Sequence, residues 1–288
     1  MSFEKVATKD EYFRELSETP TVSWPALLLF VLAVTMFVAS TIGGVFGILP
    51  ILASCLINGF ALYLFFSPMH DALHGSASKY QFLNELIGRL SLVLLIPAAP
   101  LEIARWVHLR HHAHTTADID PDNFMHHGKW WVLPFRWANF DFFYIAEFFK
   151  NAGPAAERSV RALIVYLSVF LGLVVLLVLF GYGLELLVLW FIPSRIGLAL
   201  VGFVFVFLPH YPADISAREN KYQATTTRLG WEWVLTPLMV YQNYHLVHHL
   251  YPNIPFYNYI KVWHLRYEEI TKNNPAIQTA FGLGPINR

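Results

Sequence analysis

Four long apolar runs alternate with glycine-rich turns and long polar segments along the chain. A helix that crosses a bilayer needs roughly 20 apolar residues. Gly43 and Gly44 separate the first two runs, and Gly181 and Gly183 separate the last two, as expected for tight turns. The pattern therefore predicts four membrane spans in two helical hairpins, at about residues 25–42, 46–66, 162–180 and 184–208.

A fifth apolar stretch, at about residues 90–103, is harder to interpret. It has about 14 residues and contains Pro97 and Pro100. This length is short for a span and favours an interfacial or re-entrant segment. The alternative, a fifth full span, would place His74 and His108 on opposite sides of the membrane.

Composition supports a membrane protein with a single domain over residues 1–288. Charged residues make up 14% of the chain, against about 25% in soluble domains. Basic and acidic residues balance at 20 each, so nothing indicates nucleic-acid binding. The single cysteine, Cys55, lies in an apolar run and is expected to be a small buried residue. One thiol excludes a four-thiolate iron–sulfur site within the chain.

Basic residues predict the orientation of the spans. With four spans, both termini and the segment 67–161 lie on one side, and all Lys and Arg residues except Arg195 fall there. We therefore assign this side, including a polar tail at residues 1–20, to the cytosol. Arg195 lies inside the fourth run, where a charge is costly. It is expected to snorkel or to pair with Glu185, or else to bind a polar group of a substrate.

Nine of the 13 histidines follow a pattern. Residues three and four apart project from one face of a helix, so each cluster is expected to offer two or three imidazoles to one point. All of them fall on the predicted cytosolic side. They comprise the pair His70 and His74, the triplet His108, His111 and His112, the triplet His245, His248 and His249, and the isolated His210 in LPHYP.

The histidines predict a metal centre. Neutral imidazole suits zinc, copper, iron and nickel, and nine donors exceed the needs of one ion. Two ions with four or five nitrogens each fit the number. Spacing alone leaves iron, copper and zinc open.

The pattern H-x3-H, H-x2-H-H, H-x2-H-H around two hairpins resembles the membrane fatty acid desaturase and hydroxylase superfamily over roughly residues 45–260. HDALHG, HLRHHAHTTADIDPD, FLPHYP and NYHLVHHLYPNIP look most like bacterial carotenoid ketolases and hydroxylases. The resemblance implies two non-haem irons, dioxygen as co-substrate, and oxidation of a membrane lipid, a fatty acyl chain or a carotenoid. It also implies a separate electron donor of the ferredoxin, rubredoxin or cytochrome b5 type.

The same resemblance implies a set of site residues. By motif, all nine patterned histidines would be iron ligands. Some desaturases hold a metal-bound water with an asparagine one helical turn before the isolated histidine; Val206 stands there, so that role is not assigned.

Polar residues near the clusters are candidates for orienting the ligand rings, because a ligand histidine commonly donates its second N–H to a carboxylate or carbonyl. The Asp120-Pro121-Asp122 sequence is equally typical of a plain turn. His114 is an alternate ligand, whereas His126, His127 and His264 look like ordinary surface histidines. The candidate orienting residues are Asp71, Asp118, Asp120, Asp122, Asp214 and Asn243.

The aromatic residues of segment 130–144 are typical of an interfacial anchor, and lining a lipid channel is the alternative. The predicted fold is an all-α integral membrane protein: four transmembrane helices in two hairpins plus a cytosolic helical cap that holds a di-metal site. Two other functions stay open. A metal transporter would place ligands near the midplane of its spans, and a membrane haem protein would place single histidines on facing helices.

Overall fold

The computed structural model describes residues 8–96 and 99–287. Within these residues four helical segments are long and apolar enough to cross a membrane. They are α2 (Trp24–Val45), α3 (Ile51–His74), α8 (Pro154–Leu179) and a composite segment, Gly183–His210. The prediction of an all-α integral membrane protein with four spans is confirmed.

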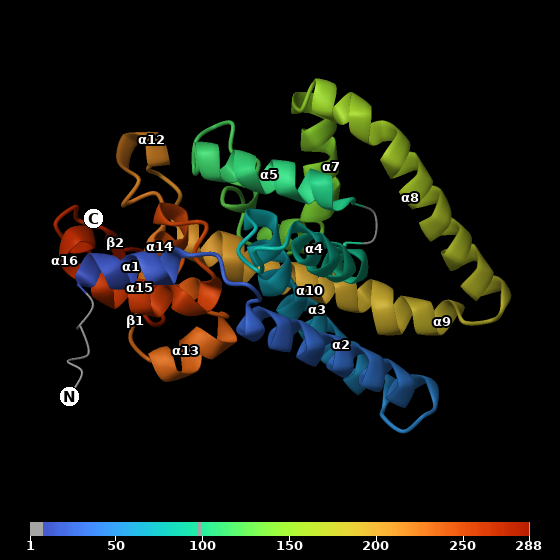
Figure 1. Ribbon diagram of the computed structural model, residues 1–288. Helices are drawn as coiled ribbons and strands as arrows, with labels where there is room; N and C mark the ends of the chain where they lie inside the picture. Colours follow the sequence, from blue (N-terminus) through green and yellow to red (C-terminus); the bar gives the residue numbers. More distant parts are fainter. Residues whose placement is uncertain (1–7, 97–98, 288) are drawn as a thin grey trace.

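Tight turns join the spans in pairs. The α2–α3 turn contains Gly47, whose φ of 67° lies in the left-handed region that glycine adopts without strain. After α8, Gly181 has a φ of 88°, and the next N–H, that of Tyr182, donates to the Leu177 carbonyl. This is the usual way in which a glycine ends a helix. Figure 1 shows both turns at one end of the molecule and the C-terminal helices at the other.

The composite span changes its helical winding at two prolines. It consists of α9 (Gly183–Leu186), a π-helical stretch (Leu187–Phe191), α10 (Ile192–Val201), a second π-helical stretch (Gly202–Phe207) and α11 (Leu208–His210). Pro193 and Pro209 each follow a π-helical stretch. Proline lacks an N–H and cannot bond to the carbonyl four residues earlier. For Pro193 that carbonyl belongs to Leu189, and Asn58 of α3 donates to it at 2.7 Å, so the freed group is satisfied inside the bundle.

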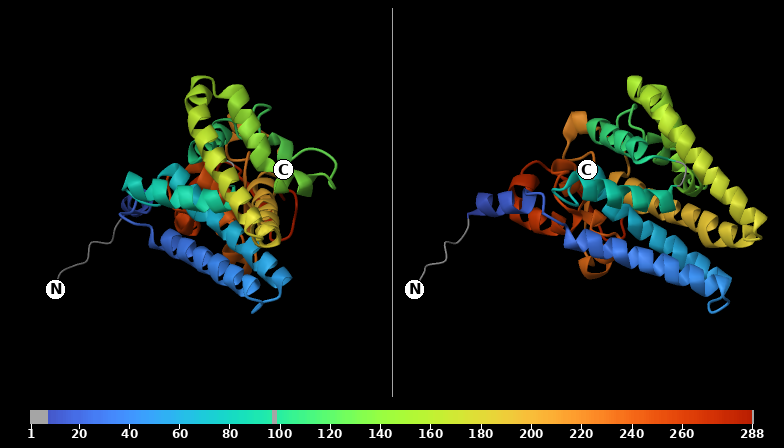
Figure 2. Two further views of the ribbon diagram at one scale, coloured as in Figure 1. Left: turned by 90° about the vertical axis from the view of Figure 1, so that its right-hand side faces the viewer. Right: turned by 45° about the vertical axis from the view of Figure 1, so that its right-hand side comes forward.

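Helix α3 lies at the centre of the membrane bundle and packs against α2, α10 and α4 (Gln81–Leu95). Small residues permit close contact with α10. A Cβ at Gly197 would lie 2.9 Å from the Cβ of Leu62, and one at Gly59 would lie 2.7 Å from the Cγ2 of Ile196. Such small residues let membrane helices approach closely. Helix α8, by contrast, is almost entirely exposed on the outside of the protein (Figure 2), as expected for a helix that faces lipid.

The predicted segment 90–103 is not one element. Its first part completes α4, and its last part begins α5 (Leu101–His114). Pro97, which suggested a short segment, lies outside the described residues. The Leu101 side chain, at the start of α5, packs against Gly88 of α4. Hydropathy alone could not separate the helices, because both contribute apolar residues to the same run.

The cap consists of short helices from three parts of the chain. A two-stranded parallel sheet, which the sequence did not predict, joins β1 (Thr226–Leu229) to β2 (Ala276–Thr279). The helices are α1 (Lys9–Ser17), η1 (Asn123–Met125), α6 (Leu133–Ala138), α7 (Phe140–Asn151), α12 (Ala217–Asn220), α13 (Glu232–Leu238), η4 (Gln242–Tyr244), α14 (His245–Leu250), η5 (Phe256–Asn258), α15 (Tyr259–Leu265) and α16 (Tyr267–Thr271).

The N-terminal segment is not a simple polar tail. Residues 1–7 lie outside the described residues, but Thr8 caps α1 through a reciprocal pair of hydrogen bonds with Glu11. Helix α1 then packs on the C-terminal part of the cap. The Phe13 ring lies edge-on to Tyr251, and the Arg266 guanidinium covers the Phe13 ring. The apolar face of a short, charged helix was too weak a signal to predict this contact.

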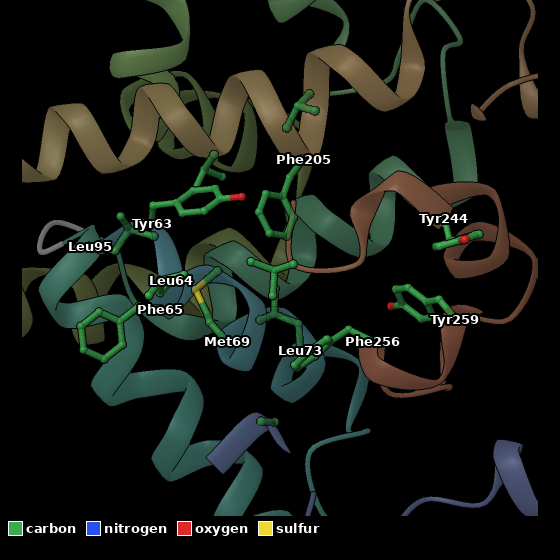
Figure 3. Packing of buried hydrophobic residues seen from close by; sticks show 14 of the residues in the cluster. Tyr63, Leu64, Phe65, Met69, Leu73, Leu95, Phe205, Tyr244, Phe256 and Tyr259 are labelled. Atoms are coloured by element: carbon green, nitrogen blue, oxygen red, sulfur yellow. The ribbon is translucent and has the colours of Figure 1, made fainter. Parts of the chain in front are cut away.

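One hydrophobic core connects the bundle to the cap (Figure 3). Phe205 of the second π-helical stretch lies edge-on to Tyr63 of α3, and the Tyr63 hydroxyl donates to the Leu238 carbonyl at 2.6 Å. Tyr244 and Tyr259 continue the core within the cap and are fully buried. The centre described below is built into the junction between these two parts.

Arg195 does not pair with Glu185, as the sequence suggested. Its guanidinium makes a two-pronged ion pair with the buried carboxylate of Asp141 in α7, at 2.8 and 2.9 Å. The rings of Phe142 and Phe191 flank the guanidinium. The pairing could not be read from the sequence, because Asp141 lies 54 residues before Arg195.

Candidate metal centre

The structure brings all nine patterned histidines together in two groups. In each group the nearest ring nitrogens lie within 4.8 Å of one another. The five-histidine group contains His70, His74, His108, His112 and His248; the four-histidine group contains His111, His210, His245 and His249. Helices α3, α5 and α14, together with α11, supply them, and these helices meet at the junction of bundle and cap.

Each triplet divides between the two groups, rather than converging on one point as the sequence suggested. His108 and His112, four residues apart on α5, point to the five-histidine group, whereas His111 points to the four-histidine group. On α14 the division is reversed: His248 joins the first group, and the pair His245 and His249 joins the second. Adjacent residues of an α-helix diverge by about 100° because one turn has 3.6 residues, so one H-x2-H-H sequence can serve two neighbouring points.

Distances between ring nitrogens fit the spacing of ligands on a metal. Nitrogens ~2.1 Å from one ion lie about 3.0 Å apart at a right angle and about 3.4 Å apart at a tetrahedral angle. In the five-histidine group the Nε2–Nε2 distances are 2.7 Å for His74–His108, 3.2 Å for His108–His112 and 2.8 Å for His112–His248. In the four-histidine group they are 3.0 Å for His245–His249 and 3.4 Å for His111–His249 and for His210–His249.

Hydrogen bonds at the second ring nitrogen fix which nitrogen faces the centre. His210 Nδ1 lies 2.7 Å from the Val206 carbonyl, and His245 Nδ1 lies 2.5 Å from the Gln242 side-chain oxygen. A carbonyl oxygen only accepts, so Nδ1 must carry the proton in both rings. The Nε2 lone pair of each ring is then free for a metal, as in other metal-binding histidines.

Carboxylates hold the ring of His111. Its Nδ1 donates to Asp120 at 2.9 Å and lies 3.3 Å from Asp122. Asp120 also accepts from the backbone N–H of Thr116 at 2.7 Å, which fixes the carboxylate itself. The Tyr144 hydroxyl donates to Asp122. The Asp120-Pro121-Asp122 sequence is therefore more than a plain turn, because both of its carboxylates face one ring.

Two hydroxyl groups contact the remaining Nδ1 atoms of α14. Tyr259 Oη lies 2.9 Å from His248 Nδ1, and Thr115 Oγ1 lies 3.3 Å from His249 Nδ1. Sequence analysis missed Gln242, Tyr259 and Thr115. Gln242 stands three residues before His245, so its side chain reaches forward by one turn to that ring. The other two had no signal in the sequence, since they meet the rings only through the fold.

The other polar candidates lie elsewhere. Asp71 accepts from the Phe256 N–H at 3.4 Å and so ties α3 to η5. The Asn243 side chain donates to the Thr236 hydroxyl at 3.1 Å and so does not hold the His245 ring. Asp118 and Asp214 are exposed. Neither of them, nor His114, belongs to any of the groups of potential ligands among the described residues.

Burial sets the protonation of most of the rings. It lowers the pKa of His108, His112, His245, His248 and His249 well below the usual value for histidine, and neighbouring imidazoles lower it further. These rings are therefore neutral, the state that binds metal. Burial also lowers the pKa of His111, but Asp120 and Asp122 outweigh it and raise that pKa to about 9. A metal at the four-histidine group would displace the His111 Nε2 proton.

A narrow cavity with a volume of ≈ 50 Å³ adjoins both groups. His70 and His108 reach it from the five-histidine group, and His111 and His245 reach it from the four-histidine group. Most of its other walls are apolar, with Phe66, Met69, Leu73, Phe140, Val201 and Phe205 among them. The segment of aromatic residues divides between the surface and this cavity: Trp130 and Trp131 are exposed, whereas Phe140 and Tyr144 line the cavity.

His126 is not the ordinary surface residue expected from the sequence. It is 5% exposed, and its ring lies beside that of His210, with 5.4 Å between ring centroids. His127 and His264 are exposed, as expected.

Comparisons with known proteins identify the family. Residues 46–281 match the fatty acid desaturase family. The chain is 30% identical over 193 residues to a beta-carotene ketolase of Paracoccus sp. strain PC1, covering 65% of this chain and 69% of the ketolase. It is 29% identical over 192 residues to a beta-carotene ketolase of a second Paracoccus strain, with the same coverage. It is 27% identical to an sn-1 oleoyl-lipid 12-desaturase of Anabaena variabilis, covering 87% of this chain and 77% of the desaturase.

The family match includes all nine patterned histidines and most of the chain. The matched residues contain three of the four candidate spans and both histidine groups, whereas α2 lies before them. This protein is an oxidoreductase that belongs to the fatty acid desaturase family.

Proposed function

We propose that the two histidine groups bind two non-haem iron ions and that the protein uses dioxygen to hydroxylate or desaturate a membrane lipid, either a fatty acyl chain or a carotenoid. The observation that carries the proposal is the convergence of nine buried or half-buried imidazoles, five in one group and four in the other, beside an apolar cavity. The nitrogen-only donor set and its spacing fit such ions. When bound, the irons supply the oxygen activation needed to attack an unactivated C–H bond.

The cavity supports an apolar chain as the substrate. Its small volume and its phenylalanine and leucine walls suit a slender hydrocarbon segment better than a polar head group. The curated relatives named above act on beta-carotene and on an oleoyl lipid, which share a long apolar chain. In this proposal the walls place one carbon of the chain beside both groups and exclude water. Tyr144 and Asp122 form the polar part of the wall.

A separate protein is proposed to deliver electrons. The only cysteine, Cys55, is buried in α3 and cannot hold an iron–sulfur cluster alone. A ferredoxin, a rubredoxin or a cytochrome b5 type of protein would dock on the cap, which we place in the cytosol together with both termini.

The arrangement disfavours the two other functions. A transporter would place its ligands near the middle of the spans, whereas His70 and His74 occupy the last two turns of α3, and His210 ends the composite span. A haem would need space between facing histidines. The rings here contact one another directly, with 4.4 Å between the centroids of His70 and His248.

Two measurements test the proposal together. Protein expressed with supplementary iron and purified in detergent is expected to contain about two non-haem irons per chain by elemental analysis. Lipid extracts of cells that express the protein with beta-carotene or with oleoyl lipids are expected to contain a hydroxylated, ketonised or further desaturated product. Absence of bound metal, or one haem per chain, would contradict the iron proposal. Metal-loaded protein that leaves both lipid classes unchanged would contradict the substrate proposal.

A further inference from the structure

The two histidine groups differ in their number of donors. One group offers five ring nitrogens and the other offers four. Both groups contain only histidine nitrogens, and α5 and α14 supply both of them, whereas α3 contributes only to the five-histidine group and α11 only to the four-histidine group. If iron binds both groups as proposed, the metal at the four-histidine group has one protein donor fewer.

His126 lies next to the group that has fewer donors. Its ring centroid is 5.4 Å from that of His210. Within the four-histidine group the corresponding separations from His210 are 4.8 Å to His111, 4.8 Å to His245 and 5.2 Å to His249. His126 is thus only slightly farther from His210 than His249 is, although it lies outside the set of four whose ligand nitrogens are all within 4.8 Å of one another.

The His126 ring stacks on Phe207, with 6.3 Å between the centroids, but makes no hydrogen bond among the described residues. Both of its ring nitrogens are buried, and neither has a hydrogen-bond partner there. No other histidine in that part of the chain leaves both ring nitrogens buried and without a partner. A buried polar group without a partner is costly, so such a group requires an explanation. Adjacent His127, in contrast, is exposed.

The backbone around His126 is held firmly in place. Arg136 donates to the carbonyls of Phe124 and His127, both at 2.6 Å, and the Trp137 indole donates to the Met125 carbonyl at 3.1 Å. These bonds fix the chain on both sides of the ring. The same segment begins with the carboxylates that hold His111, so it already serves the four-histidine group from one side.

We propose that His126 is a tenth histidine of the centre and a nitrogen donor to the metal held by His111, His210, His245 and His249. This inference rests on the proposed function, since it requires a metal at that group. Nothing in the spacing of the three histidine clusters points to His126, because it stands in a connecting segment and shares no helix with another ligand.

Metal retention tests the proposal without relying on activity. Four proteins are loaded with Fe²⁺ in the absence of oxygen and then exposed to increasing concentrations of a chelator. They are the wild type, His126→Leu, His126→Gln and the matched control His127→Leu. Wild type and the control are expected to keep two irons per chain. His126→Leu is expected to lose one of the two irons at a chelator concentration at least about tenfold lower than wild type does. Tenfold is the lower end of the loss of metal affinity seen when a group that supports a metal ligand is removed. His126→Gln should lie between them.

A second measurement separates metal binding from packing. Leucine removes a buried polar group that has no partner and can pack on the Phe207 ring. The metal-free His126→Leu protein is therefore expected to melt at the same temperature as metal-free wild type or above it, and only the stabilisation by added Fe²⁺ should shrink. Equal chelator resistance of wild type and both His126 variants would overturn the inference, as would a lower melting temperature of His126→Leu without any change in iron retention. Wild-type protein without iron would instead overturn the proposed function.

Discussion

Each imidazole of the two groups has two nitrogens, and the protein determines which one faces the centre. The Nδ1–H of His210 donates to a backbone carbonyl, that of His245 to an amide oxygen, and that of His111 to a carboxylate. In each ring the Nε2 atom remains available to face the centre. The histidines themselves could be predicted from sequence, because helical spacing places them on common faces. Most of their partners could not, because Tyr259 and Thr115 reach the rings only through the tertiary fold.

His210 is the patterned histidine with no neighbour in a cluster. We expect His210→Ala to abolish oxidation while leaving a folded protein in the membrane, because the four-histidine group loses a nitrogen. Product formation is the measurement, with exposed His264→Ala as the silent control and His112→Ala as the inactive reference. Near-normal product from the His210 variant would remove it from the site.

Asp120 provides a test of the support around the ligands. We expect Asp120→Ala to weaken iron binding at the four-histidine group by about 10- to 100-fold, the range seen when a group that orients a ligand histidine is lost. The reason is that Asp120 accepts from His111 Nδ1 and is itself fixed by the Thr116 N–H. Iron content under a fixed chelator concentration is the measurement. Asp118→Ala, on the exposed part of the same loop, is the control and should keep wild-type iron.

At the scale of elements, regular helix geometry and its interruptions together build the centre. The H-x2-H-H spacing distributes the rings of α5 and α14 between two groups. Proline-linked π-helical stretches shape the composite span that ends at His210. Hydropathy predicted the four spans but not these interruptions, since winding depends on local backbone bonds. It also ended the second span at residue 66, although α3 continues to His74 and carries the first histidine pair to the centre.

The ion pair between Arg195 and Asp141 joins α10 to the aromatic helix α7. Asp141 is almost completely buried, and its partner lies in a membrane span. Removing one partner of a buried pair leaves an uncompensated charge and costs about 3–5 kcal/mol, whereas apolar replacement of both is often neutral. We therefore expect Asp141→Leu to lower the melting temperature in detergent strongly, and the double variant Asp141→Leu with Arg195→Leu to recover most of the loss. A double variant no more stable than the single one would show that the pair does not act as a unit.

Over the whole molecule, the centre lies where the bundle meets the cap, and both hairpin turns lie at the opposite end (Figure 1). The sequence predicted this division, because every histidine cluster fell on the side that carries the basic residues. It did not predict the parallel pairing of β1 with β2 or the contact of α1 with the C-terminal helices. Both depend on segments that are distant in sequence and too short to show a clear periodic pattern.

This division predicts the orientation of the protein in the membrane. With four spans, the sequence predicts all Lys and Arg residues except Arg195 on the side of the cap and the termini, and such residues tend to be retained in the cytosol. Single cysteines can be placed in a Cys55→Ala background at Lys129 and Lys272 on the cap side, and at Ile48 and Tyr182 in the two hairpin turns, all four of which are exposed. We expect a membrane-impermeant thiol reagent applied to intact cells to label only the turn positions, and to label the cap positions only after the membrane is opened. Labelling of one cap position but not the other from outside would favour an odd number of spans between them, and labelling of both would reverse the orientation and place the centre outside the cytosol.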